Sequence, residues 1–194
     1  MKNARKGKAA IWDSNVIKKM RSRLISPQQR LIFEISLFTG ERVGAITQLK
    51  VNDCYKNGRV LDAITFASST RKSTKHGEAA TRQVAVHPDL RYHLERYTPP
   101  QAGYLFPTRL KSGSVSGHIT TSAVDKYWRS IFADFGLSGY STHSSRRWVI
   151  NQLRKSGISI VTIAETMGMN IATVRLYLDD DPSECKRAIA TLTV

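Results

Sequence analysis

The most informative part of this sequence is THSSRRW, residues 142–148. It contains a histidine, His143, followed three positions later by an arginine, Arg146. A tyrosine, Tyr177, comes 31 positions after Arg146, and a further arginine, Arg42, lies far upstream. Guanidinium groups hold phosphate oxygens bidentately, and a phenol oxygen can act as a nucleophile. Two arginines, an imidazole and a phenol therefore predict attack on a phosphodiester by a side-chain oxygen.

The charge of the chain indicates which phosphodiester is the substrate. Of its 194 residues, 30 are Lys or Arg and 15 are Asp or Glu, which gives a net charge of +15. Such an excess predicts a polyanionic partner. On charge alone, a ribosomal or merely soluble basic protein is the alternative. Combined with the phosphodiester chemistry, the charge predicts double-stranded DNA as the partner. The hydrophobic content of 41% is enough for the core of one domain.

Composition disfavours several other classes of protein. The two cysteines, Cys54 and Cys185, form no CxxC motif, so neither a structural disulfide nor a zinc site is predicted. The basic N-terminus is followed by no apolar segment and does not resemble a signal peptide. The longest apolar stretch, residues 31–38, contains Glu34 and is too short to span a bilayer. We therefore expect a cytoplasmic protein with no membrane partner, no metal and no cofactor.

Hydrophobic spacing and capping residues predict a mainly helical chain. A helix is expected from about residue 13 to 24, and Ser26-Pro27 is typical of the start of another. Apolar residues at helical spacing over 31–38 form a core face, and Gly40 ends that helix. The remaining helices are predicted over 43–49, over 88–97 and through most of the chain after residue 118.

A smaller part of the chain is predicted to be extended. Residues 60–66 and 83–86 look like strands, and the polar, basic stretch 70–77 between them predicts a hairpin with a long turn. Residues 98–118 are rich in Pro, Gly and Ser and are interpreted as loop. The expected fold class is mainly α with a small antiparallel β-sheet.

Taken in order, these features resemble the catalytic domain of the tyrosine recombinases, also called the phage integrase family. The resemblance covers nearly the whole chain, from about residue 13 to 194. The segment TGER, residues 39–42, resembles the first arginine box of the family, and HSSR, residues 143–146, resembles its His-x-x-Arg motif. The other matching segments are Lys75-His76-Gly77, Leu105-Phe106-Pro107, and Tyr177 at the position of the nucleophile. Each match alone is a weak signal, but their order and spacing make a strong one.

The resemblance implies a site-specific DNA recombinase or integrase that cleaves and rejoins strands without metal or ATP. Arg42 and Arg146 would neutralise the charge of the phosphodiester transition state. Lys75 would protonate the leaving 5′ oxygen, and His143 would orient or deprotonate a neighbouring group near neutral pH. Tyr177 would form a covalent 3′-phosphotyrosine, which a second 5′ hydroxyl then resolves.

Two positions depart from the family pattern, and one assignment stays open. The family usually has a histidine or tryptophan after a glycine in the segment before the tyrosine, where this chain has Met169. Methionine cannot donate a hydrogen bond to phosphate, but its packing can imitate that of tryptophan, so Met169 is kept among the candidate catalytic residues. Ala45 stands where an acidic residue commonly supports the first box. Lys72 remains an alternative to Lys75 as the proton donor.

A second class of function is also open. Residues 162–174 follow the pattern of a helix-turn-helix, with Ala164, Gly168 and Val174 at its packing, turn and core positions. The alternative is therefore a non-catalytic DNA-binding regulator, or a weakened recombinase that acts mainly by binding DNA. It gives no role to the upstream arginine box or to the His-x-x-Arg motif.

The expected organisation is a basic arm over 1–12, a catalytic domain over 13–182 and a tail helix over 183–194. In the family such a tail docks on a neighbouring protomer; folding back on its own core is the alternative. The free chain is expected to be a monomer, because its positive charges repel one another, and a homotetramer on DNA, because strand exchange joins two duplexes. The resemblance places it in a prokaryotic host, near the nucleoid, encoded by a phage or mobile element.

Overall fold

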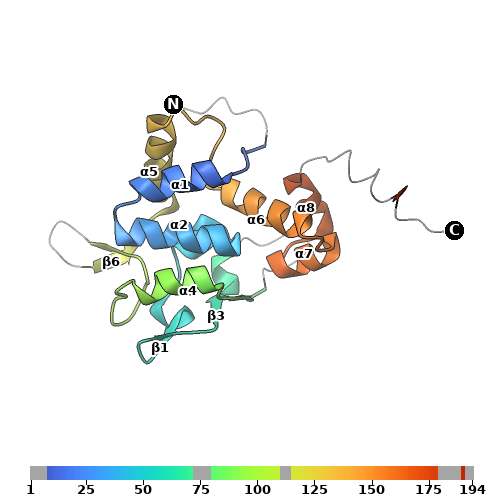
Figure 1. Ribbon diagram of the computed structural model, residues 1–194. Helices are drawn as coiled ribbons and strands as arrows, with labels where there is room; N and C mark the ends of the chain where they lie inside the picture. Colours follow the sequence, from blue (N-terminus) through green and yellow to red (C-terminus); the bar gives the residue numbers. More distant parts are fainter. Residues whose placement is uncertain (1–7, 72–79, 110–114, 179–188, 191–194) are drawn as a thin grey trace.

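The computed structural model describes residues 8–71, 80–109, 115–178 and 189–190. Figure 1 shows α2 in the middle of the molecule, with α1 and α5 on one side, α4 on the other, and α6, α7 and α8 gathered at one end. The helices are α1 (Ser14–Arg23), α2 (Pro27–Thr39), α3 (Val43–Ile46), α4 (Pro88–Glu95), α5 (Thr121–Asp134), α6 (Ser144–Lys155), α7 (Ile160–Met167) and α8 (Ile171–Tyr177). Two short 3₁₀ segments are η1 (Val51–Asp53) and η2 (Ser68–Thr70).

Local sequence explains where the first two helices begin and end. The Asp13 side chain accepts a hydrogen bond of 2.8 Å from a backbone N–H in the first turn of α1. Pro27 occupies the first turn of α2, where its missing N–H costs no helical hydrogen bond. Gly40 ends α2 in the left-handed conformation, with φ 60°, and a Cβ there would lie 2.7 Å from Cε of Met167. The left-handed backbone conformation therefore favours glycine just before the arginine box, whereas the flexible end of Met167 could move to admit a Cβ.

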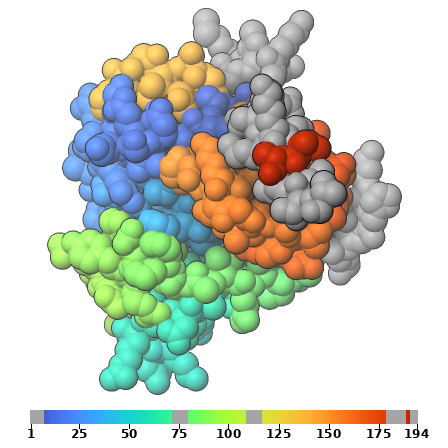
Figure 2. Space-filling model, turned by 45° about the vertical axis from the view of Figure 1, so that its right-hand side comes forward, coloured from blue at the N-terminus to red at the C-terminus, as the bar shows by residue number. Residues whose placement is uncertain are grey.

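The described strands form three two-stranded antiparallel sheets. The strands are β1 (Tyr55–Lys56) with β2 (Arg59–Val60), β3 (Ala63–Phe66) with β4 (Arg82–Ala85), and β5 (Pro107–Arg109) with β6 (Val115–His118). The expected sheet corresponds to β3 and β4, in which Ala63 pairs with Ala85 and Phe66 with Arg82. The β1–β2 hairpin projects from the body of the molecule next to it (Figures 1 and 2).

The interpretation of residues 98–118 as loop was wrong, because β5 and β6 lie there. These strands are short, their register shifts between Pro107 and Arg109, and Gly117 has a φ of 60°. Backbone hydrogen bonds hold these two strands together. Their residues do not alternate between apolar and polar, so the sequence lacks the pattern from which a strand is predicted. The fold class itself, mainly helical with small antiparallel sheets, is confirmed.

The main core is built around α2. Three aromatic rings, Trp12, Phe33 and Trp128, meet there with centroids 5.0 to 5.8 Å apart, in tilted and edge-to-face arrangements. A second, smaller cluster joins α6, α7 and α8, and its fully buried members are Ile150, Ile163, Ala164, Met167 and Val174. Helices α6, α7 and α8 therefore share a core of their own beside α2.

The described part of the expected N-terminal arm is packed against the domain. Trp12 is buried in the main core, and the backbone N–H of Ala10 donates to the carbonyl of Gly139 at 2.9 Å. Lys8 reaches the C-terminal end of α8, where its Nζ donates to the carbonyl of Leu178 at 3.1 Å. Among the described residues, no helix is both long and apolar enough to cross a membrane.

Candidate active site

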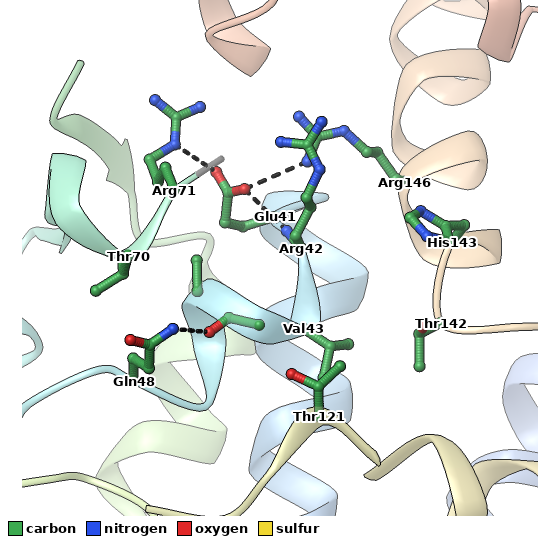
Figure 3. Close-up of a pocket in the computed structure, with 12 residues that line it drawn as sticks. Glu41, Arg42, Val43, Gln48, Thr70, Arg71, Thr121, Thr142, His143 and Arg146 are labelled. Carbon is green, nitrogen blue, oxygen red and sulfur yellow. Dashed lines mark hydrogen bonds and ion pairs between the residues drawn. The ribbon is translucent and has the colours of Figure 1, made fainter. Parts of the chain in front are cut away.

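A cavity of about 370 Å³ lies where the segment after α2 meets the beginnings of α5 and α6. Figure 3 shows the cavity with the polar side chains on its wall. The charged and titratable residues that line it are Glu41, Arg42, Arg71, His143 and Arg146. Three of the predicted site residues, from two distant parts of the chain, are thus brought together.

Arg42 occupies the N-cap position of α3, immediately after the sharp end of α2. Its side chain is half-buried, and Figure 3 places its guanidinium beside that of Arg146. Within the described part of the chain, this guanidinium has no hydrogen-bond or ion-pair partner. The donors of Arg42 therefore remain for a ligand in the cavity.

Arg146 lies in the first turn of α6 and is only 1% exposed. Its Nη1 lies 3.3 Å from Oε1 of Glu41, its Nη2 donates to the carbonyl of Met167 at 3.5 Å, and its Nε lies 3.3 Å from the sulfur of Met169. Desolvation by burial and the charge of Arg42 lower the pKa of Arg146 to about 10, although Glu41 acts to raise it. Burial is thus the main cause of the lowered pKa of Arg146, and Glu41 offsets only part of it.

Glu41 supplies the negative charge at this site. Its carboxylate is buried, accepts the backbone N–H of Arg42 at 2.9 Å, and forms ion pairs with Arg71, Arg82 and Arg146. Burial acts to raise the pKa of Glu41, but the charges of Arg146 and Arg82 and the backbone hydrogen bond outweigh it. The net pKa lies below the usual range, so Glu41 is ionised at neutral pH.

His143 lies in the N-cap position of α6 at the rim of the cavity. Its side chain makes no capping hydrogen bond, so the alternative of a purely capping histidine finds no support. Desolvation by the surrounding protein, followed by repulsion from Arg42 and Arg146, lowers the pKa of His143 below 6.5. The imidazole is therefore neutral at pH 7 and can accept a proton.

Tyr177 is the last residue of α8, and its backbone carbonyl is held by α6. The Nε of Arg147 donates to this carbonyl at 3.3 Å, and the side-chain amide of Asn151 donates to it at 2.9 Å. Tyr177 is half-buried and does not line the cavity. Its side-chain oxygen is nevertheless near enough to Arg146 that a negative charge on it would act to raise the pKa of Arg146. The two neighbouring arginines of α6 thus differ in their contacts. Arg146 faces the cavity, and Arg147 binds the end of the helix that carries Tyr177.

Several expected features lie outside the described residues. They include both candidate lysines, Lys72 and Lys75, and nearly all of the tail over 183–194. Of that tail only residues 189–190 are described, and Ile189 is exposed. Arg71 and Arg82, which pair with the same carboxylate oxygen of Glu41, lie on either side of the segment that carries the two lysines.

The sequence analysis missed three residues of this site, Glu41, Arg71 and Arg82. Glu41 stood inside the arginine box without an assigned role, although a carboxylate next to a buried helix end needs a cationic partner. Ala45 lines the cavity but carries no charge. The carboxylate of the site comes instead from Glu41, at a different position of the same arginine box. Among the described residues, no group of three or more His, Cys, Asp or Glu side chains could hold a metal ion.

The helix-turn-helix pattern corresponds to α7 and α8. Gly168 joins them with a φ of 57°, and Met167 and Val174 pack with Ile150 of α6 in the smaller cluster. A Cβ at Gly168 would also lie 2.6 Å from a guanidinium nitrogen of Arg71. The pair of helices therefore packs on α6 and contacts Arg71 and Arg146 of the site through the carbonyl of Met167.

Comparison with known proteins identifies the family. The sequence model of the phage integrase family matches residues 14–184. The chain belongs to the phage integrase family. This match spans the arginine box, the His-x-x-Arg motif and Tyr177. No curated protein matches the chain significantly.

Solved structures of this family share the fold. The crystal structure of XerA recombinase superposes with a TM-score of 0.70 at 17% identity, over 97% of this chain and 66% of that one. An integrase from mycobacterium phage Brujita gives 0.61 at 17% identity, over 97% and 58%. The XerH recombinase, in a post-cleavage complex with palindromic difH substrate, gives 0.65 at 21%, over 98% and 55%. This integrase-family chain therefore spans between about half and two thirds of the proteins that it resembles.

Proposed function

We propose that this chain is a site-specific DNA recombinase that cleaves and rejoins strands through a covalent 3′-phosphotyrosine. The observation that carries the proposal is the convergence of Arg42 and Arg146 at one cavity, with a neutral His143 at its rim. Four arginines meet there, and among the described residues Glu41 is the one carboxylate that pairs with any of them, so the site carries an excess of positive charge. A phosphodiester supplies the balancing negative charge.

The proposed reaction needs only side chains of this chain. The phenol oxygen of Tyr177 attacks the phosphorus, and the bond to the 5′ oxygen breaks as the bond to tyrosine forms. His143 takes the phenolic proton, directly or through a water molecule, and Lys75 gives a proton to the leaving 5′ oxygen. Attack by another 5′ hydroxyl reverses these steps, so the energy of the linkage is conserved.

The proposed partner is double-stranded DNA, supported by the net charge of +15 and by the structure of XerH site-specific recombinase bound to palindromic difH substrate. Residues 13–182 would act as the catalytic domain, and the tail over 183–194 would dock on a neighbouring protomer. The proposed active form is a tetramer on DNA, assembled from monomers in the prokaryotic cytoplasm.

A substrate nicked close to the cleavage site tests this function, because the short leaving strand diffuses away and traps the covalent adduct. The wild-type chain should form a protein–DNA adduct in EDTA, and Tyr177→Phe, which lacks only the phenolic oxygen, should form none. An adduct that persists in Tyr177→Phe would contradict the proposal.

The arrangement of α7 and α8, together with Met169 at the position of a usual phosphate donor, favours one competing function. A non-catalytic DNA-binding protein would bind a specific duplex and form no adduct under any condition. The same assay, read beside a binding measurement, distinguishes the two functions.

A further inference from the structure

One buried carboxylate contacts arginines from three separate segments. Oε2 of Glu41 lies 2.9 Å from Nη1 of Arg82 on β4 and 3.3 Å from Nε of Arg71 after η2. Its Oε1 lies 3.3 Å from Nη1 of Arg146 on α6 and accepts the backbone N–H of Arg42. Figure 3 shows Glu41 between Arg71 on one side and Arg42 and Arg146 on the other. Both oxygens are therefore used, and each contacts two separate segments of the chain.

The three paired guanidinium groups are themselves buried. The side chains of Arg71 and Arg82 are 5% exposed and that of Arg146 is 1% exposed. Their other described acceptors are neutral, being backbone carbonyls and methionine sulfurs. Among the described residues, Glu41 is thus the single anion that offsets three buried cations, a situation that is costly unless the pairing is well defined.

The contacts of Arg146 leave a defined set of donors for a ligand. A guanidinium has five N–H donors, of which Nε carries one and each Nη carries two. Nε–H is directed to Met169, one Nη1–H to Glu41 and one Nη2–H to Met167. Among the described residues, the second N–H on each Nη group has no partner, and this is the pair that a bidentate contact with phosphate requires.

We propose that Glu41 is a positioning residue for the cleavage reaction. It fixes the guanidinium of Arg146 so that the two remaining N–H groups point at the phosphate, and it holds this arrangement together with Arg71 and Arg82. The inference rests on the proposed function, because it assigns the partner through which Arg146 acts on the scissile phosphate.

A second buried carboxylate of the same chain provides a matched control. Glu34 on α2 is fully buried and pairs with Arg21 at 2.7 Å and Arg30 at 2.8 Å, away from the cavity. Glu34→Gln and Glu41→Gln each replace a buried carboxylate among arginines by a neutral group of the same shape. A purely structural role predicts similar consequences for both.

The test measures single-turnover strand cleavage on two substrates, one with a normal phosphate and one with a methylphosphonate at the scissile position. The methylphosphonate has no negative charge for the arginines to neutralise. Glu41→Gln should bind the duplex within a few-fold of wild type and cleave the phosphate about 100-fold more slowly, the scale of one lost transition-state donor. Its loss on the methylphosphonate should be much smaller. Glu34→Gln should cleave both substrates at wild-type rates per folded molecule.

Equal losses on the two substrates, or wild-type cleavage by Glu41→Gln, would overturn the inference. If Glu41→Gln does not fold, Glu41→Asp retains the charge while shortening the side chain by one carbon. Glu41→Asp should have a melting temperature close to that of wild type and show the same selective loss of cleavage on the phosphate substrate. The absence of that selectivity would also overturn the inference. Should the wild-type chain itself form no Tyr177-dependent adduct, the proposed function fails first, and the role of Glu41 falls with it.

Discussion

The Nε–H of Arg146 lies 3.3 Å from the thioether sulfur of Met169 and donates to it. The sulfur is a weak acceptor and has no proton to give, so Met169 can support the arginine but cannot bind the phosphate. Its half-buried side chain also packs against the cluster of α6, α7 and α8. Met169 thus contacts Arg146 and offers no donor of its own, whereas a histidine at this position could contact Arg146 and also donate a hydrogen bond to a phosphate.

Met169→His should accelerate cleavage, because one ring nitrogen can accept from Nε of Arg146 while the other donates to the phosphate. We expect a gain of about tenfold, below the full effect of an added transition-state donor. Met169→Leu is the control, since it preserves apolar packing and removes the acceptor, and it should cleave more slowly than wild type. A loss of rate in Met169→His would show that the site is shaped around methionine.

Arg42→Ala and Arg146→Ala should each impair cleavage far more than DNA binding. The charge that they stabilise is greatest in the transition state, so a loss of about 3–4 kcal/mol in activation free energy is expected. Single-turnover rates and duplex affinities, measured at one salt concentration, give the two effects separately. Equal losses in rate and affinity would reduce both residues to phosphate anchors.

Cleavage should lose rate at acid pH as His143 becomes protonated. The pKa of His143 is lowered below 6.5, so the imidazole is neutral and active at pH 7. The cleavage rate should therefore begin to decline only below pH 7. His143→Gln should abolish this acid limb and cost about 100-fold at pH 7.5, the lower range for a lost general base. An unchanged pH profile in His143→Gln would exclude proton acceptance by this residue.

Lys75, and not Lys72, should protonate the leaving 5′ oxygen. A 5′-bridging phosphorothiolate has a leaving group that needs no proton, so it should restore cleavage by Lys75→Ala to near the wild-type rate on the same substrate. Lys72→Ala should cleave the ordinary phosphodiester and should not require the phosphorothiolate leaving group. The opposite pattern would transfer the role to Lys72.

Deletion from Ser183 onward should prevent assembly on DNA without unfolding the domain. Both described core clusters are made of residues before this point, so the melting temperature should change little. Cleavage should be weak, and native gels should show bound monomers where the full chain forms tetramers. Tetramers formed by the truncated chain would require a different surface to link the protomers.

Local signals in the sequence were the reliable ones. Asp13, Ser26-Pro27 and Gly40 mark helix ends because capping and proline effects act within one turn, and all three positions agree with the structure. The approach of Arg42 to the HSSR motif was inferred from family resemblance and is seen at the cavity.

The missed features depend on long-range contacts. The pairing of Glu41 with Arg71, Arg82 and Arg146 joins segments up to about a hundred residues apart, and no periodicity or local motif reports such a contact. The β5–β6 ladder was missed for a related reason, since its stability comes from backbone pairing rather than from a pattern of side chains.

The guanidinium of Arg147 bridges two carbonyls from opposite ends of the described chain, that of Ala9 and that of Tyr177. Lys8 adds a parallel link to the next residue, Leu178. Any displacement of the polypeptide around Ala9 must therefore either break these hydrogen bonds or drag the end of α8 along with it. The helix that bears Tyr177 is thus tethered to the chain that leads into the domain, and tension applied there is transmitted to the end of α8 through the side chains of Arg147 and Lys8.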